Sequence, residues 1–254
     1  MSRIDNSYDN LIYQPRSQSE AEIGYILAST ASALAYKALP SFSNPFKKQM
    51  TREWNNNHLY KDVFINSINK SKLQEKGLKL IHEIGSSDIG KGLNACYIPS
   101  EKVIKLNLEK ASISGFHELG HAMNHLNGGF GKILQNLRRP GMIIAGIMAP
   151  IALLSRSKPR GEKRNFGDFI QDNCGKIAFI SMLPTVAEEA LASYRGIQIA
   201  KKSGLNDALA KNLRKFYGKA LLSYAGYALV TGVSVFLASK ITEVFTRPKL
   251  IQKP

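Results

Sequence analysis

The residues with the clearest potential for chemistry form the string His117-Glu118-Leu119-Gly120-His121. On a helix, positions i and i+4 share one face, so both imidazoles can point at the same metal ion. Glu118 lies beside them, where it can accept a proton from water that the metal has made more acidic. The alternative is a surface helix that happens to carry two histidines. The pattern predicts a metal-binding helix over 112–126 with Glu118 as general base.

A catalytic zinc ion takes three protein ligands and keeps one position open for water. His125 continues the i+4 series after His117 and His121. At a rise of 1.5 Å per residue, however, His125 lies about 12 Å from His117 along the helix axis, which is too far for both to share an ion with His121. We therefore expect His125 on the helix surface or behind the ligands, and the third ligand elsewhere.

Two adjacent glutamates, Glu188 and Glu189, are the other candidates, on a helix predicted to begin near Pro184. Neighbouring helical residues point about 100° apart, so only one of the two can face the metal. Carboxylates also stabilise the first turn of a helix, which would explain Glu188 better than Glu189. The face of Glu189 continues with the small residues Ala192, Ser193 and Gly196. Such residues would let this helix lie close to the histidine helix.

These segments resemble a known family. His117-Glu-Leu-Gly-His-Ala122, followed by Glu189-Ala-Leu-Ala-Ser193, is similar to the membrane-bound gluzincin metallopeptidases. The chain is most similar to the YugP-type neutral zinc metallopeptidases, which are distant relatives of the HtpX-type proteases. The stretch Tyr97–Leu106 is similar to the strand that precedes the zinc helix in those proteins, and the resemblance covers roughly residues 77–200.

The resemblance implies that Zn²⁺ binds to His117, His121 and Glu189, with Glu118 as general base and acid. It also places Ser193, one turn after Glu189, where the family has an Asp or Ser that supports the ligands. The implied activity is hydrolysis of peptide bonds in a peptide or protein substrate.

The implied substrate site is strand 103–108, on whose edge an extended peptide would add. Alternating residues give this segment one apolar face, the pattern of a half-buried strand. Spacing does not single out the residue that stabilises the oxyanion; the candidates are Tyr194, Arg195, His58 and His82.

Three apolar segments follow the histidine helix, at 141–154, 177–187 and 220–239. Only 220–239 has the length of a membrane span, with no charged residue and a lysine at each end. The alternative for this segment is a buried core helix. The two shorter segments are predicted to form a hairpin that dips into or just crosses the bilayer, although either alone could belong to a core.

The charge of the chain predicts an anionic partner, because 35 Lys+Arg against 19 Asp+Glu leave 35 − 19 = +16. Basic clusters border the apolar segments, at 138–139, 156–164, 201–219 and 240–253. This placement favours the headgroups of an anionic lipid membrane, and no nucleic acid is expected as a partner. A re-entrant hairpin would keep the first two clusters on one face with the metal site, which we predict to be cytoplasmic.

These patterns predict a mainly α protein with a small β-sheet, that is, a zincin-like α+β core with a membrane hairpin and a C-terminal transmembrane helix. Residues 1–19 are predicted to be a disordered tail and 20–254 a single membrane-associated zinc metallopeptidase domain. The predicted function is a membrane-associated zinc endopeptidase. The alternatives are a zinc-binding membrane protein without peptidase activity and a basic nucleic-acid-binding protein.

Overall fold

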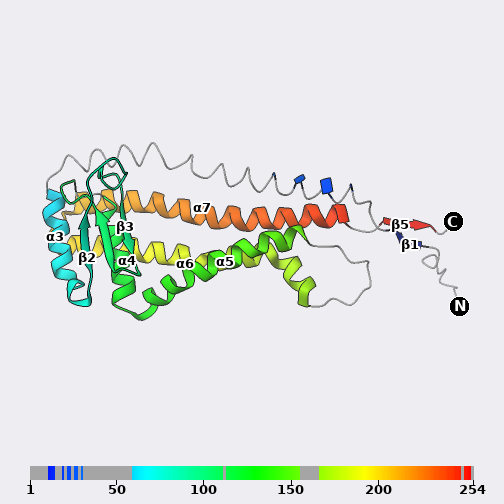
Figure 1. The fold of residues 1–254 in the computed structure, drawn as a ribbon, viewed down its shortest axis with the longest axis horizontal. Coiled ribbons are helices and arrows are strands. Elements are labelled where there is room, and N and C mark those ends of the chain that lie inside the picture. Colours follow the sequence, from blue (N-terminus) through cyan, green and yellow to red (C-terminus); the bar gives the residue numbers. More distant parts are fainter. Residues whose placement is uncertain are drawn as a thin grey trace. The chain divides into compact units, whose positions relative to one another are not determined.

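The computed structural model describes residues 59–110, 113–154 and 166–246, together with 11–14, 249–252 and a few positions between 19 and 30. The described chain is mainly helical with a small sheet, as the sequence predicted. Its helices, shown in Figure 1, are α3 (Leu59–Ser71), α4 (Gly115–Leu126), α5 (Gly129–Leu153), α6 (Phe166–Lys202) and α7 (Asp207–Thr246). A short 3₁₀ turn, Gln74–Lys76, follows α3.

The internal contacts of the chain group into two compact units, where the sequence suggested one domain over 20–254. The first unit comprises Ala38–Met142 and Met182–Ala228, and it contains α3, α4 and a three-stranded sheet. The second comprises Met1–Lys37, Ile143–Ser181 and Leu229–Pro254. Helices α5, α6 and α7 each contribute residues to both units.

The sheet of the first unit consists of β2 (Lys79–His82), β3 (Ala95–Ile98) and β4 (Val103–Leu106) in the order β2-β4-β3. Strand β4 pairs in parallel with β2 and antiparallel with β3. The expectation that strand 103–108 is an edge strand is therefore wrong. Both backbone edges of β4 are already paired, so β4 cannot receive an added peptide strand. The two outer strands of this sheet are β2 and β3.

The hydrophobic core of the first unit lies where the sheet meets α3 and α4. Phe64 of α3 and Phe116 of α4 are buried with Ile104 and Leu106 of β4, and the two phenyl rings meet edge to face with centroids 5.4 Å apart. Residues of α6 and α7, among them Ala200 and Leu213, belong to the same core. This packing fixes α4, which carries both histidines.

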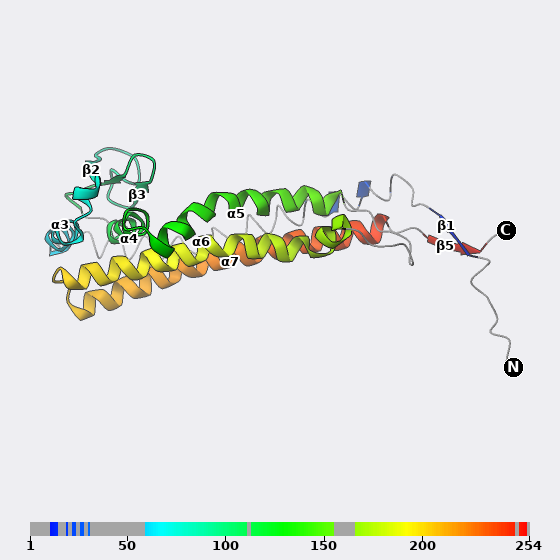
Figure 2. The same ribbon diagram turned by 90° about the horizontal axis from the view of Figure 1, so that it is seen from below.

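Helix α6, drawn in Figure 2 as one long helix, contains Pro184 in its interior. The prediction that a helix begins near Pro184 is therefore wrong. Proline removes one backbone hydrogen bond inside a helix, but packed neighbouring helices can maintain the rest, as is common in membrane proteins. Glu188 and Glu189 consequently lie in the interior of a 37-residue helix, far from its first turn.

The second unit combines a short antiparallel sheet with the remaining parts of the three long helices. Strand β1 (Leu11–Gln14), which lies within the predicted tail 1–19, pairs with β5 (Lys249–Gln252). The rest of that tail and the basic loop 156–164 lie outside the described residues.

Apolar side chains are exposed along the helices of the second unit. They include Ile143, Ile147, Leu229, Val233 and Phe236. Within the described residues, one helix is long and apolar enough to cross a membrane, Asp207–Phe245, and 28% of its most apolar window is buried. This helix contains the segment 220–239. The predicted hairpin arms 141–154 and 177–187 lie within α5 and α6, apart from Leu154, which follows the end of α5.

Candidate metal site

Helices α4 and α6 approach each other closely because glycines lie at their contact. A Cβ atom built on Gly120 would lie 1.9 Å from the carbonyl oxygen of Ala192, and one built on Gly196 would lie 2.2 Å from that of Phe116. The sequence predicted this close approach from the small residues of α6, Ala192, Ser193 and Gly196, and the structure confirms it. The backbones are therefore near enough for short side chains to meet.

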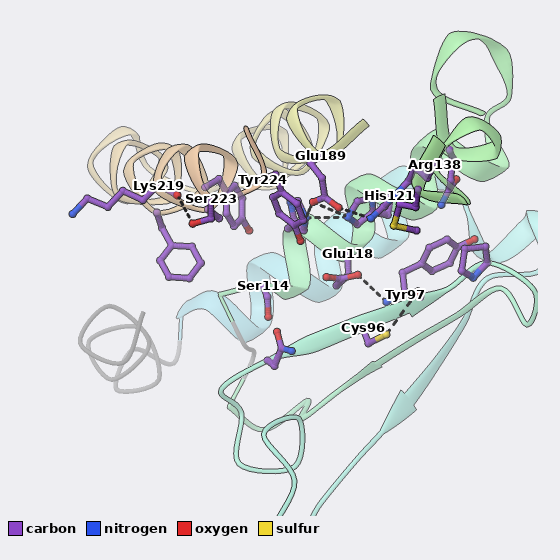
Figure 3. A pocket seen from close by; sticks show the side chains of 18 of the residues that line it. Cys96, Tyr97, Ser114, Glu118, His121, Arg138, Glu189, Lys219, Ser223 and Tyr224 are labelled. Carbon is purple, nitrogen blue, oxygen red and sulfur yellow. Dashed lines mark hydrogen bonds and ion pairs between the residues drawn. The ribbon is translucent and has the colours of Figure 1, made fainter. Parts of the chain in front are cut away.

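Three donor atoms converge where these helices meet. His117 Nε2 lies 2.9 Å from His121 Nε2 and 3.0 Å from Glu189 Oε2, and His121 Nε2 lies 3.6 Å from the same carboxylate oxygen. All three side chains are largely buried, with exposed fractions of 14% for His117, 7% for His121 and 2% for Glu189. In Figure 3, Glu189 points from α6 toward His121 of α4. This group of His and Glu side chains could hold a metal ion.

The second nitrogen of each imidazole has its own partner on α6. His121 Nδ1 lies 2.8 Å from Glu188 Oε1, and His117 Nδ1 lies 3.0 Å from Ser193 Oγ. Partners of this kind fix the tautomer and the ring orientation, which leaves Nε2 free to face a metal. Adjacent Glu188 and Glu189 therefore face different atoms of the site, as their separation of about 100° around the helix requires.

Two further side chains complete the buried polar network behind the ligands. Asn124 Nδ2 donates to Glu188 Oε1 at 2.8 Å. Arg138 of α5 donates to Glu188 Oε2 at 2.7 Å and to Glu189 Oε1 at 2.6 Å. The interpretation of Glu188 as a first-turn carboxylate is wrong, because its side chain is fully buried and bound to His121, Asn124 and Arg138.

The contacts among His121, Glu188 and Glu189 shift the pKa of each of these groups toward its charged form when no metal is bound. Burial by itself lowers the pKa of His121, but hydrogen bonds with Glu188 and Glu189 raise it to about 10. Burial by itself raises the pKa of both glutamates, but hydrogen bonds with the histidines hold each pKa below its ordinary value. At neutral pH, His121 thus carries a proton between two carboxylates, and an arriving metal ion must displace that proton.

Glu118 lies on the open side of the donor group. One of its carboxylate oxygens lies within 4.8 Å of donor nitrogens of His117 and His121. The backbone N–H of Tyr97, in strand β3, donates to Glu118 Oε2 at 2.7 Å (Figure 3). This contact holds the carboxylate between the edge strand and the donor atoms.

His125 lies outside the group of donor atoms, as its distance along the helix predicted. Its Nδ1 lies 2.7 Å from the hydroxyl of Tyr97. Burial and the nearby Lys132 and Lys102 lower the pKa of His125, so its neutral ring can accept the Tyr97 O–H. Tyr97 therefore joins β3 to α4 twice, through its backbone at Glu118 and through its side chain at His125.

A cavity of about 750 Å³ opens in front of the donor atoms. It is bordered by β3 and α4 and by residues of α5, α6 and α7. Tyr217 and Tyr224 of α7 line it, and Figure 3 shows Tyr224 beside Glu189. The Tyr217 hydroxyl donates to the carbonyl of Ile113 at 2.6 Å, and the Tyr224 hydroxyl interacts with the Glu189 carboxylate.

The four residues considered for oxyanion stabilisation do not line this cavity where the structure describes them. Tyr194 is exposed, the guanidinium of Arg195 donates to the carbonyl of Met123, and His82 accepts the backbone N–H of Leu108. His58 lies outside the described residues. Tyr224 does line the cavity, and the sequence did not single it out because it lies in the segment 220–239, where an aromatic residue is equally typical of a membrane helix.

The structure brings together every residue proposed from the sequence for the ligand set and its surroundings: His117, Glu118, His121, Glu189 and Ser193. Sequence reasoning missed the contacts of Glu188, Asn124 and Arg138. The only feature of the sequence that indicated these contacts was the pair of adjacent glutamates. Two neighbouring carboxylates that are both buried point in different directions, so each needs its own polar partners.

Comparisons with protein-family models, with curated proteins and with solved structures find no match for this chain. The evidence for its chemistry is therefore the arrangement of side chains in the site.

Proposed function

We propose that this chain is a membrane-associated zinc endopeptidase. The observation that carries the proposal is the convergence of His117 Nε2, His121 Nε2 and Glu189 Oε2 beside Glu118. Zinc binds imidazole nitrogen and carboxylate oxygen at about 2.0–2.2 Å, and tetrahedral geometry then separates its ligand atoms by about 3.3 Å. The three observed separations, 2.9, 3.0 and 3.6 Å, bracket that value. Two histidines and one glutamate also leave the fourth position open.

The proposed mechanism divides the work between the metal and Glu118. Zinc, when bound, supplies Lewis acidity that makes water a better nucleophile and polarises a carbonyl group. The Glu118 carboxylate takes the proton of the attacking water and then gives it to the leaving amine. The Tyr97 N–H holds Glu118 Oε2, which leaves the other carboxylate oxygen available for this transfer.

We place the peptide substrate along β3, in the role first expected of strand 103–108. Strand β3 borders the cavity through Cys96 and Tyr97, and its pairing with β4 occupies only one of its edges. Its other edge includes the Tyr97 N–H that contacts Glu118. A peptide that adds to this edge would bring a peptide bond next to the general base.

Purified protein should contain about one zinc ion per chain, and His117→Ala or Glu189→Ala should remove it, because each variant leaves two ligands. Elemental analysis after gel filtration measures this stoichiometry. His125→Ala is the matched control, since it removes a histidine of the same helix that lies outside the donor group. Equal zinc contents in the His117 and His125 variants would contradict the proposed site.

Membrane association is supported by α7 and by the charges that border it. The helix Asp207–Phe245 has sufficient length and apolar character, and most of its apolar window is unburied. Six basic residues lie in 201–219, before its apolar part, and four lie in 240–253 after it. Because cytoplasmic flanks carry the excess of Lys and Arg, we propose that the metal site faces the cytoplasm.

Membranes from expressing cells should retain the chain after an alkaline carbonate wash, which removes peripheral proteins. The orientation can be read from Glu101→Cys, at an exposed turn of the unit that carries the site, in a chain whose Cys96 and Cys174 are changed to serine. A membrane-impermeant thiol reagent should label this cysteine in inside-out vesicles and not in right-side-out vesicles. Release by carbonate would contradict membrane insertion, and the reverse labelling would contradict the cytoplasmic orientation.

A further inference from the structure

Arg138 makes a contact that the proposed mechanism does not use. Its two terminal nitrogens bind two different carboxylates, Nη1 to Glu188 Oε2 at 2.7 Å and Nη2 to Glu189 Oε1 at 2.6 Å. The side chains of Glu188 and Glu189 are 0% and 2% exposed, and that of Arg138 is 27% exposed. The planar guanidinium therefore spans both buried carboxylates from α5.

This contact divides the two oxygens of Glu189 between different partners. Oε1 accepts from Arg138, while Oε2 lies 3.0 Å from His117 Nε2 and 3.6 Å from His121 Nε2. A carboxylate with both oxygens available can bind one metal ion through both. With Oε1 held, only Oε2 faces the position that a metal ion would share with the histidines.

We propose that Arg138 is a positioning residue that restricts Glu189 to a single metal ligand atom and so keeps a coordination position open. The inference rests on the proposed metal site. The same contact orients His121 indirectly, because Arg138 also fixes Glu188, whose Oε1 lies 2.8 Å from His121 Nδ1. Arg138 thereby orients the proposed ligand Glu189 directly, and it also orients Glu188, the partner of the proposed ligand His121.

A lysine cannot replace arginine in this role. Arginine presents several N–H donors in a rigid planar fork, whereas the lysine ammonium is a single point of charge on a flexible chain. Arg138→Lys therefore keeps the positive charge near Glu188 and Glu189 but cannot span them with fixed geometry. This substitution separates positioning from simple charge compensation.

The test uses the full-length chain in detergent, with Co²⁺ or Zn²⁺ as the probe. In Arg138→Lys, zinc affinity should fall about 10- to 100-fold, the usual effect of removing a partner behind the ligands. The visible absorption of the cobalt form should also weaken, because a second Glu189 oxygen would raise the coordination number and five-coordinate cobalt absorbs less than four-coordinate cobalt. Arg214→Lys, the same change at an exposed arginine of α7 that does not line the cavity, should leave both measurements as in the wild type.

Arg138→Gln provides a second variant, which keeps a hydrogen-bond donor but no charge, and it should show the same two changes. Circular dichroism of the metal-free proteins reports whether each variant folds. A wild-type cobalt spectrum and zinc affinity in a folded Arg138 variant would overturn the inference while leaving the metal site intact. Misfolding of both variants beside a folded Arg214→Lys would assign Arg138 a structural role and overturn the inference too. Wild-type protein that took up neither metal would overturn the site and the inference together.

Discussion

Replacing Glu118 with glutamine should leave zinc bound and lower the rate of peptide hydrolysis by about 10²–10⁴-fold, the usual contribution of a general base. Glutamine has nearly the same shape and still offers an oxygen to the Tyr97 N–H, which now donates to Glu118 Oε2 at 2.7 Å. It cannot accept a proton at neutral pH. The substitution therefore removes the proton transfer without removing any of the three proposed metal ligands.

The measurement compares zinc content and cleavage of a fluorescently labelled unfolded protein by wild type, Glu118→Gln and His117→Ala. The His117 variant should lose both zinc and activity, which gives the pattern expected when the metal itself is absent. Equal cleavage by wild type and Glu118→Gln would show that Glu118 is not the base. A wild-type protein that held zinc and cleaved nothing would favour a zinc-binding membrane protein without peptidase activity.

The grouping of the proposed ligands could be predicted from the sequence because its constraints are local. His117 and His121 are about one helical turn apart, so a single helix places both side chains on one face. The distance along the same helix excluded His125 as a third ligand. The face of Glu189 was readable in the same way from the small residues that follow it. Only the meeting of the two helices had to be assumed, and Gly120 and Gly196 show why they can meet.

The buried partners of the ligands could not be predicted because they depend on the three-dimensional arrangement of α4, α5 and α6. Arg138 lies 50 residues before Glu188 in the sequence, and its neighbour Arg139 is chemically identical. Nothing local to the sequence indicates that the first arginine binds Glu188 and Glu189 while the second is an exposed residue at the border of the cavity. The basic pair was interpreted as a membrane flank, and both of its arginines line the cavity.

Strand order was the other feature beyond the sequence. The alternation in 103–108 reports that one face of the strand is buried, which holds equally for a central and an edge strand. Strand β3 is short and ends directly before Pro99, so its pattern is weak. The identity of the edge strand follows only from pairing across the sheet, in which β4 lies between β2 and β3.

The contact between α4 and α6 leads to the second large expected effect, that of Gly120→Ala. In an ordinary helix interior this change would stabilise the chain by about 1 kcal/mol. Here the new methyl carbon would lie 1.9 Å from the Ala192 carbonyl oxygen and 2.6 Å from its carbonyl carbon, and these are backbone atoms that cannot rotate away. The helices must separate, at a cost of about 3 kcal/mol or more.

Separation of the helices should damage the metal site as well as the fold, because His117 and His121 lie on α4 and Glu189 lies on α6. We expect Gly120→Ala to lower the melting temperature of the metal-free protein by roughly 6–12 °C and to weaken zinc binding at the same time. Gly218→Ala is the matched control: it adds the same methyl group to α7, where no atom lies within 4 Å of the new carbon. Thermal unfolding and zinc titration of the two variants give the comparison. If Gly120→Ala matched Gly218→Ala in both, the close approach of α4 and α6 could not be what assembles the site.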